Sequence, residues 1–107
     1  MQRGEVFRLR APRALRGHEQ AGRRFGVVLQ ADELLALSTI VIAPTSTHAL
    51  PASFRPEVEI EGAPTRVLVE QLGAVDPSRL GESHGWLAPD ELREVDRAVA
   101  IVLGLTR

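Results

Sequence analysis

The 107-residue sequence contains no cysteine, no lysine and no tyrosine. The absence of cysteine excludes disulfide scaffolds and thiolate zinc sites. The three histidines, His18, His48 and His84, lie far apart in the sequence, so we expect no metal and no other cofactor. No apolar run reaches the 18 residues of a membrane-spanning helix and no charged-then-apolar leader is present, so we expect a cytoplasmic protein without membrane contact.

The size and composition are those of a single globular domain. The sequence has 44% hydrophobic and 25% charged residues, which is ordinary for such a domain. A chain of this length buries only a modest core, and a second copy of the chain would enlarge it. We therefore expect one domain over residues 1–107.

The charge is unevenly distributed, although the formal net charge is only −1. Residues 1–30 carry seven arginines against two glutamates, and the other residues carry six arginines against twelve acids. Every basic residue is arginine, whose planar guanidinium matches phosphate geometry. The N-terminal third is therefore either a phosphate-binding surface or a solvated basic face.

The hydrophobic pattern predicts short strands and one helix. Strands are expected at residues 4–10, 25–30 and 39–44, with Pro44 ending the third. Residues 31–38 allow only a short helix or turn, and residues 57–71 predict a hairpin that turns at "EGAPT". Another short strand ends near Asp76, and "GESHGW" is expected to be a connection.

The last element is a helix that begins at "APDELREVDRAVAIVLGL". Pro89 suits the first helical position and two acids follow it, although Ala88 is a poor N-cap. Its apolar residues recur at helical spacing, so one face should pack on a sheet or on a second subunit. Five or six short strands with one helix favour a small, strongly bent barrel against which the helix lies.

The segment "GHEQAGRRFGVVLQ" has the glycines and basic residues of a phosphate-binding loop but the wrong context. A P-loop follows a strand, precedes a helix, and needs a lysine and a hydroxyl residue. Here Arg23 and Arg24 occupy those places and a strand follows them. The glycines are better explained as turn residues in a polar loop.

Two polar loops, at residues 12–24 and 44–56, are candidates for a site. If the second and third strands pair in antiparallel fashion, Arg24 and Ser46 come to the same end of the sheet. Thr45 and Thr47 would add hydroxyls, and His18 and Glu19 lie on the first loop. A guanidinium with hydroxyl donors suits a phosphodiester, although a hydrogen-bonded turn and a solvated loop acid also account for these residues.

The chain resembles the MazF/PemK (Kid-type) toxins of bacterial toxin–antitoxin pairs. The similarity rests on "RGEVFRL", "GHEQAGRRFGVVLQ", "IAPTST", "VLVEQLGAVD" and "GWLAPDELREVDRAVAIVLGL", which occur in the family's order over nearly the whole chain. It implies a mainly β (α+β) fold, namely a small SH3-like barrel of five to seven short strands with a C-terminal helix. It also implies a homodimer, and a cognate antitoxin that blocks the RNA groove.

The activity that the resemblance implies is metal-independent, sequence-specific cleavage of single-stranded RNA to a 2′,3′-cyclic phosphate and a 5′-hydroxyl. Arg24, Ser46 and Glu19 match the family's catalytic arginine, its catalytic threonine and the acid of its "EQxG" segment. The remaining residues that we expect to bind RNA are Arg16, His18, Gln20, Arg23, Thr45, Thr47 and Gln71. With only four aromatic residues in the chain, base stacking contributes less than hydrogen bonding.

Two departures from the family pattern affect this site. Phe25 replaces the usual proline after the catalytic arginine, which restores a backbone amide and relaxes the backbone. Ser46 replaces the commoner threonine, which keeps the hydroxyl but loses the rotamer preference of a β-branched side chain.

Two alternative functions remain open at this point. One is a non-enzymatic toxin of the same barrel shape that poisons DNA gyrase through its C-terminal helix, and the other is a catalytically silent barrel that binds RNA or protein. The gyrase mode would make Arg24 and Ser46 dispensable, and the departure at Phe25 keeps the silent barrel open.

Overall fold

A computed structural model of the chain describes residues 1–10 and 24–105. Within this described part of the chain, three short 3₁₀ helices lie between strands, namely η2 (Asp32–Leu34), η3 (Val69–Gln71) and η4 (Pro77–Arg79). No helix among the described residues is long and apolar enough to cross a membrane. The strands and the α-helix are β1 (Glu5–Leu9), β2 (Phe25–Val28), β3 (Ile40–Ser46), β4 (Glu57–Ile60), β5 (Ala63–Val67), β6 (Gly73–Val75), β7 (Leu80–Trp86) and α1 (Pro89–Val102).

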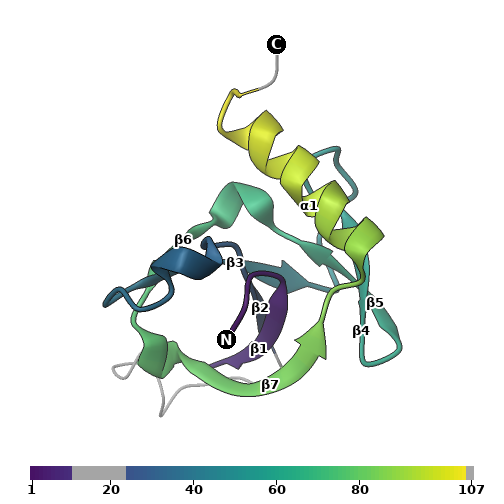
Figure 1. The fold of residues 1–107 in the computed structure, drawn as a ribbon. Coiled ribbons are helices and arrows are strands. Elements are labelled where there is room, and N and C mark those ends of the chain that lie inside the picture. The colour runs from purple at the N-terminus through teal and green to yellow at the C-terminus, as the bar shows by residue number, and fades with distance from the viewer. Residues whose placement is uncertain (11–23, 106–107) are drawn as a thin grey trace.

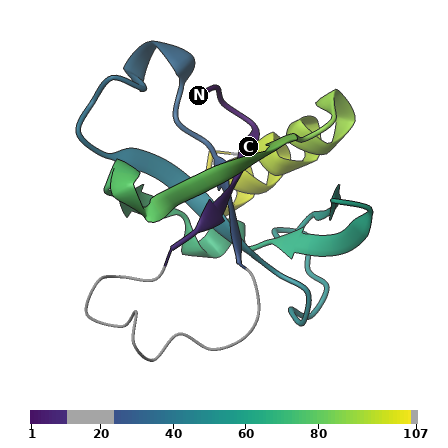
Figure 2. The same cartoon turned by 90° about the horizontal axis from the view of Figure 1, so that it is seen from below.

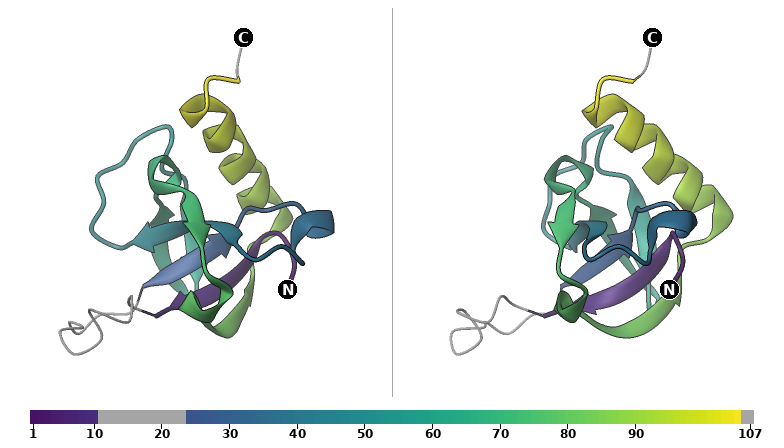
Figure 3. Two further views of the ribbon diagram at one scale, coloured as in Figure 1. Left: turned by 90° about the vertical axis from the view of Figure 1, so that its left-hand side faces the viewer. Right: turned by 60° about the vertical axis from the view of Figure 1, so that its left-hand side comes forward.

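The strands form one curled antiparallel sheet in the order β4-β5-β3-β2-β1-β7, and β6 pairs with β3 beside this path. Figure 1 shows the sheet bending into a half-barrel, and Figure 3 shows α1 lying along one side of it. The expected fold, a small mainly β barrel with a C-terminal helix, is confirmed.

The central strand β3 is buried on both faces, as its apolar run predicted. Ile40 and Ile42 pack in one cluster, whereas Ala43 packs in another on the opposite face. The prediction that Pro44 ends this strand was wrong, because β3 continues for two residues. The Pro44 carbonyl accepts a hydrogen bond from the Leu68 amide at 2.8 Å, at the place where η3 separates β5 from β6. The missing N–H of Pro44 therefore points to the gap between β5 and β6, where β3 has no paired strand that needs a donor.

The expectation that "GESHGW" is a connection was also wrong, because these residues belong to β7, which pairs with β1. Its residues do not alternate cleanly between buried and exposed, and its register with β1 shifts twice. Such irregularity is typical of strands that bend at the rim of a barrel. A simple alternation pattern therefore could not reveal β7.

The hairpin of β4 and β5 turns more tightly than expected, because only Glu61 and Gly62 lie between the paired residues Ile60 and Ala63. Both turn residues have positive φ, at 54° and 79°. This is the backbone of a two-residue hairpin turn, in which glycine is favoured because it lacks a Cβ. Figure 2 shows this hairpin from below.

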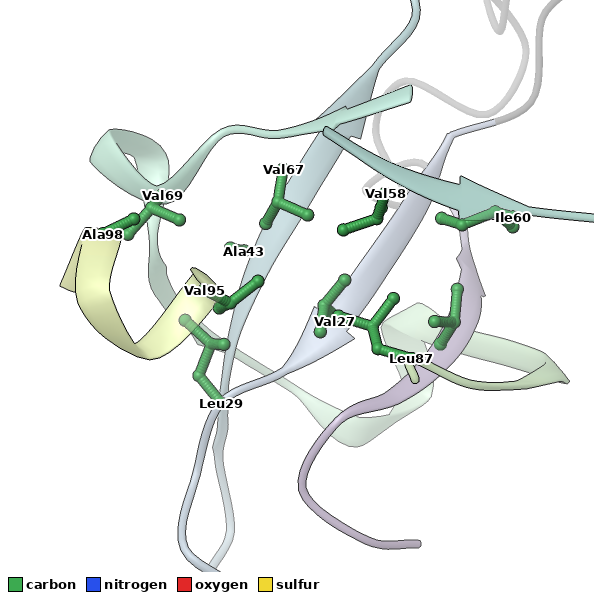
Figure 4. Close-up of a cluster of buried hydrophobic side chains, with 11 residues drawn as sticks. Val27, Leu29, Ala43, Val58, Ile60, Val67, Val69, Leu87, Val95 and Ala98 are labelled. Carbon is green, nitrogen blue, oxygen red and sulfur yellow. The ribbon is translucent and has the colours of Figure 1, made fainter. Parts of the chain in front are cut away.

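The main core lies between the sheet and α1. Val95 and Ala98 of the helix are fully buried against apolar side chains from the sheet, as Figure 4 shows. The weak N-cap at Ala88 is compensated by Glu91, whose carboxylate accepts hydrogen bonds from the Ala88 and Glu59 amides at 2.9 and 2.8 Å. The second bond also ties the start of the helix to β4.

Candidate functional site

Arg24 and Ser46 lie at the same end of the sheet. β2 and β3 are antiparallel, with Gly26 opposite Pro44, and the same register continued by two residues places Arg24 opposite Ser46. The Arg24 carbonyl also accepts a hydrogen bond from the Leu9 amide at 2.8 Å, so pairing with β1 continues through this residue. Side chains that are directly opposed in antiparallel strands share one face of the sheet. Continued in this way, the register puts Arg24 and Ser46 on the same face at this end of the sheet.

The hydroxyl of Ser46 is held in place by a local turn. Ser46 is the last residue of β3 and is partly buried, and its Oγ accepts a hydrogen bond from the His48 amide at 3.1 Å. A serine hydroxyl that accepts one bond keeps its own hydrogen to donate. Ser46 can therefore donate to a phosphate oxygen from a fixed position.

A second arginine flanks Ser46 on its other side. Arg66 of β5 stands directly opposite Ser46, and Glu57 of β4 stands opposite Arg66. The Arg66 guanidinium donates a hydrogen bond to the Arg55 carbonyl at 2.9 Å and lies 3.5 Å from the Glu57 carboxylate. This arrangement was not predictable from local sequence, because it depends on the register between β3 and β5.

An ion pair fixes the loop between β3 and β4. Two nitrogens of Arg55 lie 2.7 and 2.8 Å from one carboxylate oxygen of Glu70, and a third donates to the Leu50 carbonyl at 3.3 Å. The hydrogen bond from Arg55 lowers the pKa of Glu70 from its ordinary value. A carboxyl with a lowered pKa is a weak base at neutral pH, so Glu70 serves better as an anchor for Arg55 than as a proton acceptor.

The other expected RNA-binding residues in the described part of the chain differ in exposure. Thr47 and Gln71 are exposed, and Gln71 ends η3. Thr45 is only 3% exposed and stands opposite the buried Val67. A direct contact between Thr45 and RNA is therefore difficult, whereas Thr47 and Gln71 are accessible.

The two described histidines have different surroundings. His48 is exposed in the loop after β3. His84 of β7 is partly buried, and its Nδ1 lies 2.5 Å from the Glu61 carboxylate. Its ring meets the Phe25 ring edge-on, with centroids 5.0 Å apart. Phe25, the residue that departs from the expected proline, begins β2 and thus packs against β7.

Several expected site residues lie outside the described residues: Arg16, His18, Glu19, Gln20 and Arg23. Their proposed roles stay predictions from the sequence. Within residues 1–10 and 24–105, no group of three histidines or acids is arranged to hold a metal ion. The groups gathered around Ser46 are instead suited to an anion.

Comparison with known proteins gives a family match over most of the chain. Residues 2–103 match the family described as PemK-like, MazF-like toxin of type II toxin–antitoxin system. A candidate toxin of Mycobacterium tuberculosis, Rv3098A/RVBD_3098A, is 42% identical over 104 residues, which is 96% of this chain and 97% of the relative.

Solved structures of similar fold include toxin–antitoxin complexes. A MazE–MazF complex from Deinococcus radiodurans has a chain that is 26% identical, with a TM-score of 0.78 and coverage of 99% of this chain and 97% of that chain. An endoribonuclease from a mycobacterial species, in complex with its cognate antitoxin, matches with a TM-score of 0.82. It covers 100% of this chain and 98% of its own, and at 16% identity it shows the fold alone.

Proposed function

Because the chain belongs to the PemK-like, MazF-like toxin family of type II toxin–antitoxin systems, we propose that it is a sequence-specific endoribonuclease that cleaves single-stranded RNA without a metal ion. The observation that supports the proposal is the register between β2 and β3, because the same register continued by two residues sets Arg24 opposite Ser46, whose hydroxyl accepts a hydrogen bond from the His48 amide. Solved structures that share this fold include endoribonucleases from mycobacterial species. Cleavage of mRNA would stop translation and growth.

In the proposed reaction the 2′-hydroxyl oxygen of the RNA attacks the adjacent phosphorus. The bond from phosphorus to the 5′-oxygen breaks, and this oxygen takes up a proton from water, which leaves a 2′,3′-cyclic phosphate on one fragment and a 5′-hydroxyl on the other. Arginine side chains carry a permanent positive charge, so the role that we assign to Arg24 is to stabilise the negative charge of the transition state. Ser46 donates a hydrogen bond to a phosphate oxygen, which adds to the same stabilisation.

The proton of the 2′-hydroxyl needs an acceptor, and we assign this role to Glu19 with His18 as the second choice. Both assignments come from the sequence, because these residues lie outside the described part of the structure. A Glu19→Gln variant that cleaves RNA at nearly the wild-type rate would remove Glu19 from this role.

The wider RNA-binding surface that we propose combines Thr47 and Gln71 with the arginines of the first polar loop, residues 12–24. The attraction between these arginines and the RNA phosphates should weaken as the salt concentration rises. A cognate antitoxin would neutralise the toxin by covering this surface, and two copies of the chain would form the active homodimer. The RNA substrate would place the protein in the cytoplasm.

The proposed activity is tested by incubating the purified protein with a long single-stranded RNA in EDTA and mapping the new ends. We expect cuts at discrete short sequences, with a cyclic phosphate on one side and a 5′-hydroxyl on the other. RNA that stays intact would contradict the proposal and favour a gyrase poison or a silent binder. Cleavage only after addition of a divalent cation would contradict metal independence.

A further inference from the structure

We propose that Arg66 is an RNA-binding residue that holds a backbone phosphate on the β5 side of Ser46. The proposal rests on the endoribonuclease function proposed above and extends the site beyond Arg24 and Ser46. It comes from the register of four strands, in which Ser46 is flanked by an arginine on each side.

The four side chains form one row across the sheet. Glu57 of β4 pairs with Arg66 of β5, Arg66 pairs with Ser46 of β3, and the β2–β3 register continues the row to Arg24. Neighbouring strands are about 4.8 Å apart, so the Cα atoms of the two arginines are separated by roughly 10 Å across Ser46. A nucleic acid strand crossing this row would meet a positive charge on both sides of the hydroxyl.

Arg66 is held in position but has donors to spare. Its Nη1 donates to the Arg55 carbonyl at 2.9 Å, and its Nη2 lies 3.5 Å from Glu57. A guanidinium has five N–H donors, and these two contacts occupy only part of the fork. The side chain is 23% exposed, so the fork remains accessible. An arginine that is already fixed loses little conformational freedom when it binds a phosphate.

The neighbouring Arg55 is a useful contrast. Two of its nitrogens lie 2.7 and 2.8 Å from Glu70, so a close acid already neutralises its charge. The contact of Arg66 with Glu57 is longer, at 3.5 Å, and the Glu57 side chain is 59% exposed. An exposed ion pair of this length is weak. A phosphate can therefore displace Glu57 from Arg66 more readily than Glu70 from Arg55.

The first test is the salt dependence of nucleic acid binding by the Arg66→Gln variant. The probe is a labelled, random-sequence single-stranded oligonucleotide with uracil bases and 2′-deoxyribose, which cannot be cleaved because it lacks the 2′-hydroxyl. Fluorescence anisotropy gives the affinity over a range of salt concentrations. Loss of one phosphate contact should weaken binding roughly tenfold and reduce the slope of log K against log salt by about 0.7.

The matched control is Arg97→Gln, which removes the same charge from an exposed position on α1. It should leave the slope unchanged. Circular dichroism and thermal unfolding of each variant show whether the fold is retained. If Arg66→Gln does not fold, Arg66→Lys is used instead. Lysine keeps the positive charge, so the salt slope should be retained. The affinity for the probe should fall, because lysine lacks the planar guanidinium that matches a phosphate.

The second test uses Glu57, which competes with the phosphate for Arg66. Glu57→Gln should tighten binding about threefold, because it releases the guanidinium. The same change in an Arg66→Gln background should have no effect, since the competition is gone. Glu59→Gln, two residues further along β4, removes an exposed acid that does not pair with Arg66 and should change binding less.

The outcomes separate this inference from the proposed function. Wild-type binding that is unaffected by Arg66→Gln, with an unchanged slope, would overturn the role of Arg66 alone. An equal effect of Glu57→Gln in both backgrounds would also overturn it, because Glu57 would then act as a general negative charge. A wild type that binds no single-stranded probe at any salt concentration would contradict both the inference and the endoribonuclease.

Discussion

At the scale of single residues, the site depends on which polar groups are fixed and which are free. Ser46 is fixed by the amide of His48, whereas Glu70 is neutralised by Arg55. The Ser46 hydroxyl keeps its hydrogen to donate, whereas the Glu70 carboxylate anchors Arg55. Exposure and hydrogen bonding thus separate groups that the sequence alone treats as similar polar loop residues.

Ser46→Ala should reduce RNA cleavage about 100-fold, the usual effect of removing one hydrogen-bond donor to a developing negative charge. Ser46→Thr restores the hydroxyl and should stay within a few fold of wild type. Single-turnover cleavage with excess protein measures the chemical step for both variants. An alanine variant within threefold of wild type would show that the hydroxyl takes no part in that step.

Glu70 should make the stability of the protein depend on pH. Its pKa is lowered in the folded state, so its contribution is complete above the unfolded value, near 4.5, and is lost as pH falls through the folded value. Glu70→Gln should lower the free energy of unfolding at pH 7 by about 1 kcal/mol. Urea unfolding at pH 7 and pH 3 should show that this difference shrinks in acid. A difference that is constant with pH would contradict the ion-pair account.

At the scale of secondary structure, most elements were predictable from local sequence. The apolar run of β3 and the helical spacing before Val102 identified β3 and α1 because both signals are local. β7 was missed because it bends as it pairs with β1, which disrupts the alternation of buried and exposed residues. β3 continues past Pro44 because no neighbouring strand needs a hydrogen bond from the missing proline N–H. Predicting these features needs the arrangement of the whole sheet.

The candidate site was predictable to a similar extent. Arg24 and Ser46 could be brought together because Arg24 directly precedes β2, Ser46 ends β3, and these two consecutive strands pair with each other. Arg66 could not be added, since it faces Ser46 only through the register between β3 and the more distant β5. The burial of Thr45 was not predictable either, because three hydroxyl residues follow one another at positions 45 to 47 and nothing in the sequence distinguishes the buried one.

The turn between β4 and β5 should be sensitive to a side chain at Gly62. Its φ of 79° is strained for any residue with a Cβ, so Gly62→Ala should lower the free energy of unfolding by about 1 kcal/mol. Gly73→Ala is the control, because a Cβ at Gly73 meets only one atom, at 4.0 Å, and φ lies outside the left-handed region. Urea unfolding measures the free energy of unfolding of both variants. Equal destabilisation by Gly62→Ala and Gly73→Ala would contradict the role of the positive φ at Gly62.

At the scale of the whole molecule, the end of α1 indicates how two copies would meet. The middle of the helix packs on its own sheet through Val95 and Ala98. Beyond them Ile101, Leu103 and Leu105 are 37%, 54% and 65% exposed, which leaves apolar surface uncovered at this end. Figure 3 shows this end of the helix extending past the strands. We propose that a second copy covers it in the homodimer.

Light scattering at micromolar concentration should therefore give a mass of about 23 kDa, twice the 11.7 kDa of one chain. Leu103→Glu should shift the protein toward monomer, because it introduces a charge into the apolar contact. Leu34→Glu changes a similarly exposed leucine on η2 and should leave the dimer intact. A monomeric wild type would contradict the homodimer.

The most direct test of the whole account is the cleavage rate of Arg24→Ala, measured in EDTA on an RNA that the wild type cuts, with Arg97→Ala as the matched control. If Arg24 stabilises the transition state, the rate should fall at least 100-fold in a protein that unfolds at the wild-type temperature, and the control should cut normally. An Arg24→Ala protein that cleaves RNA at the wild-type rate would contradict the proposed site.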